Sequence, residues 1–326
     1  MKNIVIIGGG TGTSTLLLGL KKYPAHLSVI VPSWDDGGSN GRLRSELNSF
    51  PYSDARQCLV ALAEGGQTLK QLFGYRFSQG SVSGHTVANL MLAALEKITG
   101  GPEQAIATAA RLLKTKGEVL PVTLKPTVLS AVYSNGKKII GEHNIDERTG
   151  IRNEELEIRN LQLKSNGSAN PKAIAAIKNA DLIIFGPGDL HTSILPNLLV
   201  LGVAEAINKS KAKKVLVINI MTKFGQTDGF KVSNFVSELE KYLGGKLDVA
   251  IVNNKVPGGK LLKRYSQEKA KPVKMDDGGI KKFSPKIVVA DLLSDNVFSK
   301  SNGDKLKRSF LRHDSDKLAK LIWKNL

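Results

Sequence analysis

The start of the chain constrains the fold most, because a short apolar run leads directly into a cluster of glycines. The run Asn3–Ile7 is followed by the turn GGGTGTS, a helical stretch at Thr15–Lys22 and a second apolar run at Leu27–Val31. A strand, a helix and a strand at this spacing form a βαβ unit. We therefore expect the first two strands to be parallel neighbours in one sheet.

The same alternation of strands and helices returns after residue 170. Apolar runs and helical patterns follow one another as PKAIAAIKNA, DLIIFGP, SILPNLLVLGVAEAINKS, KVLVINIM, VSNFVSELEKYL and LDVAIVNN. Continuous apolar strands separated by helices indicate a parallel sheet that is covered on both faces. The predicted fold class is therefore α/β, with a Rossmann-like, doubly wound, mostly parallel sheet.

Two segments of different character separate the halves of this sheet, which we place at 1–50 and 170–326. Residues 54–115 carry apolar side chains at helical period, and residues 118–165 are β-rich, with a hairpin expected at Asn135–Gly136. No long linker and no internal repeat interrupts the chain. We therefore predict a single α/β domain over 1–326, with a helical and β-rich excursion between its halves.

Composition narrows the cellular setting. Of the 326 residues, 41% are hydrophobic, and Cys58 is the single cysteine, which fits a reducing compartment. No stretch supplies the about 20 continuous apolar residues that a membrane-spanning helix needs. We expect a cytoplasmic protein with no membrane span.

The formal net charge of +18 points to an anionic partner. Most of the excess lies in residues 201–326, and the densest basic segment is NKVPGGKLLKRYSQEKAKPVKMDDGGIKKF. Nucleic-acid binding is disfavoured, because such a segment would be rich in Arg and interleaved with stacking aromatics, whereas this one is mostly Lys around Tyr265. The segment is either a solvated face or a source of attraction for anionic ligands.

In an open parallel sheet, ligands bind beyond the carboxyl ends of the strands, so the loops after the predicted strands are the candidate sites. The first loop departs from the nicotinamide-binding pattern, since Thr13 or Thr15 stands where a third glycine is usual. Its glycines and the following helix N-terminus favour a phosphate. The alternative is a tight turn with a hydroxyl cap and no ligand. The candidate residues are Gly9, Gly10, Thr11, Gly12 and Thr13.

The second loop, DDGGSNGR, follows the second predicted strand. Its paired carboxylates can orient a sugar hydroxyl, act as a base, or hold a divalent cation such as Mg²⁺ beside a phosphate. Asp35 and Asp36 are therefore the candidates for catalysis and for a cation, although the sequence predicts no dedicated metal site. The alternative is an Asp-Gly turn with solvated charges. The candidate ligand-binding residues here are Asp35, Asp36, Gly37, Gly38, Ser39 and Arg42.

The second half of the chain supplies two more such loops, FGPGDLHTS and INIMTKFGQTDGF. Each loop by itself has the sequence of an ordinary turn. A ligand-binding site is favoured because such loops recur at the carboxyl ends of the predicted strands. Their candidates are Gly186, Gly188, Thr192, Asn219, Thr222 and Asp228. His85 and Asn89 share one helix face and are either ligand contacts or structural residues. The five histidines and one cysteine show no zinc-type spacing.

Taken in order, these motifs resemble the gluconeogenesis-factor family, which is related to 2-phospho-L-lactate transferase. The resemblance covers nearly the whole chain and rests on GGGTGTSTLLLGLKKYP, DDGGSNGRLRSEL, GHTVANLMLAAL, VLPVTLKP, GPGDLHTSILPNLLV, INIMTKFGQTDGF and LRHDSDKLAKLI. It implies a CofD-like fold that binds a uridine-diphosphate sugar such as UDP-N-acetylglucosamine, or a nicotinamide dinucleotide. It also implies Arg312 and His313, in the RHD stretch, as contacts for the diphosphate or sugar.

The resemblance leaves two functions open. The first is a cytoplasmic regulatory protein that links carbon metabolism to cell-wall synthesis and cell shape through a protein partner, as a monomer or a homo-oligomer. The second is a transferase that moves a phospholactyl group from a nucleotide-diphosphate donor to a deazaflavin acceptor. An ordinary nicotinamide oxidoreductase is disfavoured, because no acid–base residue stands out beside the first turn. The initial glycine turn, GGGTG, favours the regulatory protein.

Overall fold

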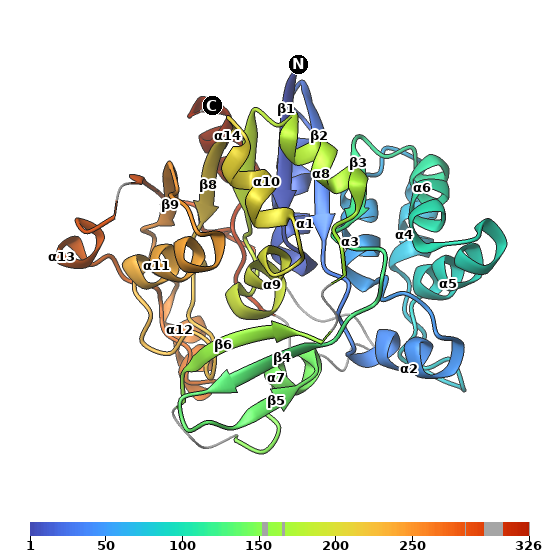
Figure 1. The fold of residues 1–326 in the computed structure, drawn as a ribbon, viewed down its shortest axis with the longest axis horizontal. Helices are drawn as coiled ribbons and strands as arrows, with labels where there is room; N and C mark the ends of the chain where they lie inside the picture. Colours follow the sequence, from blue (N-terminus) through green and yellow to red (C-terminus); the bar gives the residue numbers. More distant parts are fainter. Residues whose placement is uncertain (152–155, 165–166, 284, 297–308, 326) are drawn as a thin grey trace.

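Seven apolar runs pair in parallel to form the central sheet of the protein, whose strand order is β10-β9-β8-β7-β1-β2-β3 (Figure 1). The computed structural model describes residues 1–151, 156–164, 167–283, 285–296 and 309–325. The strands are β1 (Lys2–Ile7), β2 (Ala25–Val31), β3 (Glu118–Pro121), β7 (Leu182–Phe185), β8 (Lys213–Val217), β9 (Val249–Asn253) and β10 (Lys286–Ala290). The predicted α/β, doubly wound fold is confirmed, and the order reverses between β1 and β7.

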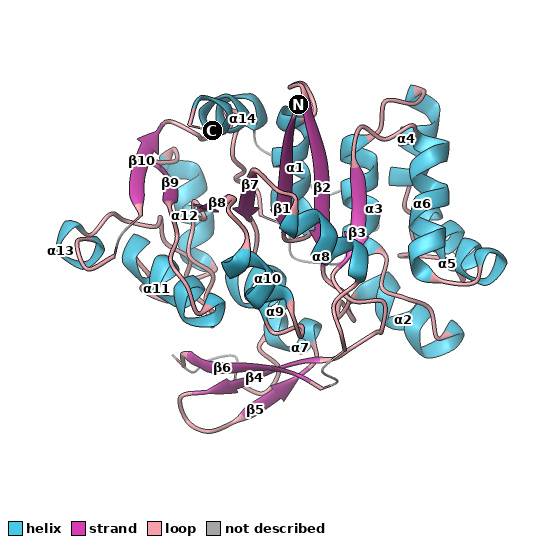
Figure 2. Ribbon diagram, turned by 45° about the horizontal axis from the view of Figure 1, so that its top comes forward, coloured by secondary structure: helices cyan, strands magenta, loops and turns pink. Residues whose placement is uncertain are grey.

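Both faces of this sheet are covered, which explains why its strands are continuous apolar runs rather than alternating ones. On β1, Val5 and Ile7 pack into one hydrophobic core, whereas Ile4 and Ile6 pack into the core on the other face. Helices α8, α10 and α11 lie on the first face, and α1, α3 and α14 on the second (Figures 1 and 2). These helices are α1 (Gly10–Leu20), α3 (Ser53–Leu62), α8 (Pro171–Lys178), α10 (Val203–Lys209), α11 (Val232–Leu243) and α14 (Ser315–Lys324).

The segment predicted to be helical, 54–115, is helical in the structure and extends from the second face of the sheet past its β3 edge. It contains α3, α4 (Gln67–Gly74), α5 (Val87–Thr99) and α6 (Pro102–Leu113). The Thr86 hydroxyl caps α5 by accepting from the backbone N–H of Asn89, and Gly100, with a φ of 85°, ends the helix. Helix α2 (Gly38–Leu47) was not expected, because the polar sequence GSNGRLRSEL has no clear apolar stripe.

A small antiparallel sheet lies beside the main one, with the order β5-β4-β6 (Figure 1). Its strands are β4 (Leu129–Tyr133), β5 (Lys138–Ile140) and β6 (Ile158–Leu163), and α7 (Glu142–Glu147) follows β5. The expected hairpin joins β4 to β5 through Asn135 and Gly136. The predicted β-rich segment, 118–165, differs at its start, since β3 pairs with β2 in the main sheet; residues 152–155 and 165 of that segment lie outside the described residues.

The long helix expected after β7 is divided into three pieces. It begins as a π-helix, η1 (Leu190–Ile194), continues as α9 (Leu195–Leu198), and resumes as α10 after Gly202, whose φ is 93°. Two further short helices in the basic segment are α12 (Gly259–Gln267) and α13 (Asp277–Ile280). None of the helices in the described part of the chain is long and apolar enough to cross a membrane.

Candidate functional site

A cleft of about 690 Å³ opens at the carboxyl edge of the sheet, at the point between β1 and β7 where the strand order reverses. This is where doubly wound folds bind ligands, and the volume falls within the about 300–1,000 Å³ of small-molecule sites. The loops after β1, β2, β7 and β8 line it, together with α7, the end of α12 and residues 309–313. Strands far apart in the sequence thus bring the predicted loops together.

The first glycine turn forms the floor of the cleft and leads into α1. Gly9 is the N-cap of α1 and no side chain caps the helix, so its first-turn N–H groups are left to bind a ligand. A Cβ on Gly12 would collide with the Pro187 carbonyl of the opposite turn, and a Cβ on Gly9 with the Asp54 carboxylate. Glycine is therefore required at position 12 because the Pro187 backbone lies so close, and at position 9 because the Asp54 carboxylate does.

The two glycine turns face each other, since the Thr13 hydroxyl donates to the Pro187 carbonyl at 3.2 Å. In the second turn, Gly188 lines the cleft, whereas the Gly186 N–H donates to the Ile7 carbonyl and is not available to a ligand. Thr192 lines the cleft from η1. The phosphate-binding potential of this turn therefore rests on Gly188 and the residues after it.

The two neighbouring aspartates of DDGGSNGR point to different places. Asp35 lines the cleft, and its carboxylate accepts hydrogen bonds from the Gly37 N–H at 2.9 Å and the Asn40 amide at 2.7 Å. Asp36 instead accepts from the backbone N–H of His143 at 2.8 Å, at the start of α7. The first aspartate is therefore placed for a ligand, and the second fastens α7 to the core.

Behind Asp35 lies a buried polar network that includes the predicted ligand contacts Ser39, His85 and Asn89. The Ser39 hydroxyl and His85 Nδ1 lie 2.8 Å apart, and the Asn89 amide donates to the hydroxyl groups of Ser39 and Ser53. Burial, with Arg42 nearby, lowers the pKa of His85. Arg42 donates to the Ser83 carbonyl. Ser39, Arg42, His85 and Asn89 do not line the cleft, whereas Ser53 does, and the network holds the loop that carries Asp35.

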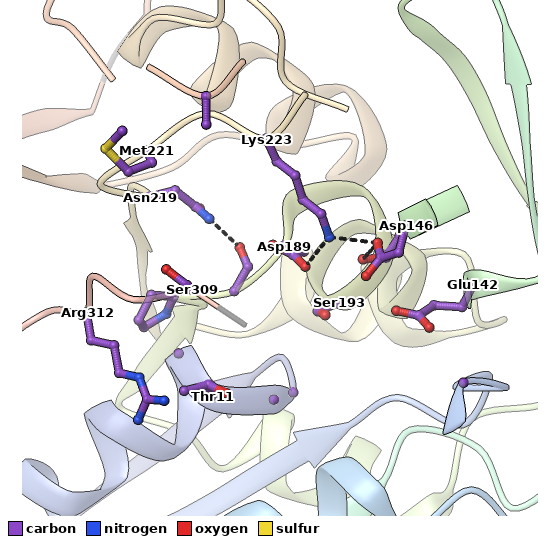
Figure 3. A pocket seen from close by; sticks show the side chains of 18 of the residues that line it. Thr11, Glu142, Asp146, Asp189, Ser193, Asn219, Met221, Lys223, Ser309 and Arg312 are labelled. Atoms are coloured by element: carbon purple, nitrogen blue, oxygen red, sulfur yellow. Dashed lines mark hydrogen bonds and ion pairs between the residues drawn. The ribbon is translucent and has the colours of Figure 1, made fainter. Parts of the chain in front are cut away.

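An acidic end of the cleft, formed by Asp146, Asp189 and Glu142 around Lys223, was not predicted (Figure 3). Lys223 Nζ lies 2.7 Å from both the Asp146 and the Asp189 carboxylates. Burial by itself would lower the pKa of Lys223, but these two carboxylates outweigh it and raise the pKa above its ordinary value. Burial, then Asp146 and Asp35, raises the pKa of Glu142 well above its usual range.

The opposite end of the cleft is apolar with cations at its margin. Met221, Tyr265 and Leu311 belong to a separate hydrophobic cluster, and Figure 3 shows Met221, Asn219 and Arg312 across the cleft from Glu142. The Tyr265 hydroxyl accepts from the Phe310 and Leu311 N–H groups, which holds the chain that leads to Arg312. An apolar wall next to a guanidinium suits the base and phosphates of a nucleotide.

Two more predicted residues serve the local backbone at this end. Thr222 lines the cleft, but its hydroxyl accepts from the Lys271 N–H at 2.9 Å, which ties the loop after β8 to the basic segment. The Asp228 carboxylate accepts from the Gly225 N–H and closes the same loop. Both residues therefore shape the wall of the cleft.

The predicted site residues thus fall into two sets. Those that line the cleft are Gly9, Gly10, Thr11, Gly12, Asp35, Gly37, Gly188, Thr192, Asn219, Thr222, Arg312 and His313. Those that do not are Thr13, Asp36, Gly38, Ser39, Arg42, His85, Asn89, Gly186 and Asp228. Asp189 lies in the FGPGDLHTS loop and Lys223 in the INIMTKFGQTDGF loop, so the sequence pattern points to their neighbourhood. Glu142 and Asp146 lie in the stretch GEHNIDE, which has no feature typical of a site.

The described residues do not form a ready-made metal site. Among the described residues, no three His, Cys, Asp or Glu side chains are grouped so that they could hold a metal ion. Asp35 and Asp36 are engaged separately with protein N–H groups. A Mg²⁺ ion at this cleft would therefore depend on oxygens that a phosphate ligand brings with it.

Comparison with known proteins decides the family. The sequence model of "2-phospho-L-lactate transferase CofD" matches residues 4–293. The chain belongs to the CofD family.

Within this family the chain is similar to proteins named gluconeogenesis factor. The one from Bacillus subtilis is 37% identical over 98% of this chain and 96% of its own length, and the one from Halalkalibacterium halodurans is 40% identical over 86% of each. A crystal structure of a UPF0052-family protein from Bacillus halodurans superposes with a TM-score of 0.90 at 36% identity, over 99% of this chain and 98% of that one. The family resemblance drawn from the motifs is confirmed.

Proposed function

We propose that the cleft binds a nucleotide-diphosphate sugar of the UDP-N-acetylglucosamine type and that this CofD-family protein acts as a regulator. The observation that carries the proposal is the uncapped N-terminus of α1, which lies against the turn at Pro187 and Gly188 in the floor of the cleft, with Arg312 beside it. N–H groups at a helix start and a guanidinium are the usual partners of a diphosphate.

The polarity of the cleft supports one orientation of the ligand. The diphosphate lies over the glycine turns, the nucleoside lies toward Met221 and Tyr265, and the sugar lies toward the carboxyl groups of Asp35 and Glu142. Carboxylates accept hydrogen bonds from sugar hydroxyls, and an apolar wall accommodates a base. The reverse orientation would place the apolar wall against hydroxyl groups.

Calorimetric titration tests this function with UDP-N-acetylglucosamine, UDP, GDP and NAD as separate ligands. We expect saturable heat with the uridine ligands, and weakening by about tenfold or more in R312Q, because a charge-assisted hydrogen bond is lost. The matched control is R159Q, which removes an exposed arginine on β6 far from the cleft. Absence of heat at millimolar UDP-N-acetylglucosamine would contradict the proposal. Tighter binding of NAD than of the uridine ligands would identify a nicotinamide dinucleotide as the ligand instead.

The regulatory role follows from the relatives named gluconeogenesis factor. We infer that the ligand-bound protein acts in the cytoplasm and links carbon metabolism to cell-wall synthesis and cell shape through a protein partner. A strain that lacks the gene should then lose growth or shape on gluconeogenic carbon sources. The wild-type gene should restore both, whereas R312Q should not. If R312Q restored growth and shape fully although it no longer bound the ligand, the regulatory role would not depend on ligand binding in the cleft.

A transferase is the second candidate function, favoured by the matching family model and by the acidic end of the cleft. Burial, then Asp146 and Asp35, raises the pKa of Glu142, and a carboxyl with a raised pKa beside a second carboxyl group suits proton transfer. An assay with a guanosine-diphosphate phospholactyl donor and a deazaflavin acceptor distinguishes the two functions. Turnover that D35N abolishes would favour the transferase.

A further inference from the structure

The protein is strongly basic, but its cleft is acidic. The chain has a formal net charge of +18, whereas the residues that line the cleft include seven Asp and Glu against four Lys and Arg. The acidic end of the cleft, around Lys223, lies across from Arg312 (Figure 3). A diphosphate adds negative charge to this cleft, so any further charge on the ligand should affect its binding.

Lys223 is paired with a carboxylate on each side, so it offers no net positive charge to a ligand. Its Nζ lies 2.7 Å from Asp146 Oδ1 and 2.7 Å from Asp189 Oδ2. The three side chains are 27% to 38% exposed and line the cleft, so a ligand can approach them. Arg148 also lines the cleft, but its guanidinium lies over the Phe224 ring, 3.9 Å from the centroid. The two carboxylates and the single ammonium therefore leave one negative charge in excess.

The second oxygen of each of these carboxylates is available to a ligand. Asp146 accepts through Oδ1 from Lys223, Gln226 and Thr192, and Asp189 accepts through Oδ2 from Lys223. In the described part of the chain, neither Asp146 Oδ2 nor Asp189 Oδ1 has a hydrogen-bond partner, and the protein encloses neither atom completely. These oxygens can therefore accept hydrogen bonds from a bound molecule.

Two more polar side chains line the cleft at this end. The side chains of Ser193 and Glu142 form no hydrogen bond or ion pair with any other described residue (Figure 3). The acidic end thus offers more acceptors than donors. It suits the hydroxyl groups of an uncharged sugar, which donate to such oxygens. A carboxylate on the sugar has no hydrogen to donate and would add a like charge.

We propose that the paired side chains of Asp146, Lys223 and Asp189 select a nucleotide sugar whose sugar is uncharged and reject one whose sugar carries a carboxylate. The inference rests on the proposed nucleotide-sugar binding and adds the class of sugar to it. Like charges that are a few ångströms apart in a partly desolvated cleft repel strongly enough for such selection. The same repulsion acts on the carboxylate of a phospholactyl group, so the inference disfavours the transferase.

UDP-glucose and UDP-glucuronate are the matched probes for this selection, because they differ only in a hydroxymethyl group or a carboxylate on the sugar. Calorimetric titration of the full-length protein measures the Kd of each. We expect UDP-glucuronate to bind about tenfold or more weakly than UDP-glucose at low ionic strength, and the difference to shrink as salt is added. Equal affinities, or tighter binding of UDP-glucuronate, would overturn the proposal without recourse to any variant.

The variant D189N isolates the charge, because it removes one negative charge and keeps the shape of the side chain. Lys223 and Asp146 then balance each other, so we expect the ratio of the two Kd values to fall by about tenfold, toward one. D189E keeps the charge and should keep the discrimination. The matched control is D295N, at an exposed aspartate that pairs with Lys255 and does not line the cleft, and it should leave the ratio unchanged.

The outcomes separate this inference from the function on which it rests. If the wild type binds neither UDP-sugar, both are overturned. If it binds UDP-glucose and UDP-glucuronate equally, only the selection by charge is overturned. A wild-type ratio in folded D189N would mean that shape rather than charge causes the discrimination, and it would also overturn the inference. Thermal unfolding shows whether each variant is folded, and D146N repeats the test if D189N is not.

Discussion

At the scale of single residues, Gly12 joins the two halves of the sheet. Its backbone lies against the Pro187 carbonyl, so G12A must push the β1 and β7 turns apart. We expect G12A to lower the free energy of unfolding by about 1–3 kcal/mol, as overpacking does, and to abolish nucleotide binding. Chemical denaturation and calorimetry measure the two effects.

The control for this substitution is G74A, at the end of α4. A Cβ on Gly74 meets nothing within 4 Å, and the residue is helical, so alanine should be neutral or stabilise the protein by up to about 1 kcal/mol. If G12A matched G74A in both stability and binding, the close approach of the two turns would have no energetic importance.

At the scale of elements, Lys223 connects the small sheet to the core. It follows β8 and pairs with Asp146 on α7 and with Asp189 after β7, while the Gln226 amide also donates to Asp146. K223M leaves two carboxylates together without their cation. We expect a loss of about 2 kcal/mol in stability, because partly buried charged hydrogen bonds are broken. Faster amide hydrogen exchange in α7 and β4–β6 should accompany this loss.

The matched control is K209M, which removes an exposed lysine paired with Glu205 one turn earlier on α10. Such surface pairs contribute about 0.3–0.5 kcal/mol, so K209M should leave exchange in the small sheet unchanged. Unchanged exchange in K223M as well would mean that packing, rather than this ion pair, holds α7 in place.

The elements also show what the sequence could and could not predict. Continuous apolar runs and glycine turns were sufficient for β1, β2, β7, β8 and β9, because burial on both faces leaves a strong pattern. Helix α2 and strand β10 were missed, since their sequences are polar or half-exposed. The residue patterns predicted the cleft only where a motif follows a strand, and the family resemblance added Arg312 and His313. Asp146 and Glu142 reach it through tertiary packing of α7, which no local pattern reveals.

At the scale of the whole molecule, buried ionisable groups make stability depend on pH. Burial lowers the pKa of His191 to about 3 and that of His313 to about 4, from an ordinary value of 6.5. Between 6.5 and these values the unfolded chain binds more protons than the folded one, so stability falls as pH falls. Burial raises the pKa values of Glu142 and Asp146, so the folded chain holds protons on these carboxyl groups more tightly than the unfolded chain does. At these two groups the free energy of unfolding therefore falls as pH rises. The two trends place the stability maximum between acid and neutral pH.

His191 allows its share of this trend to be isolated, because it is 1% exposed and neither ring nitrogen has a partner among the described residues. H191L should be at least as stable as the wild type at pH 7.5, since no hydrogen bond is lost. At pH 5 it should exceed the wild type by about 2 kcal/mol more than at pH 7.5, because protonation of the unfolded histidine no longer favours unfolding. Urea denaturation at the two pH values measures the difference, with the exposed His26→Leu as control. Parallel curves for H191L and the wild type would mean that His191 is protonated in the folded protein, with solvent reaching its ring.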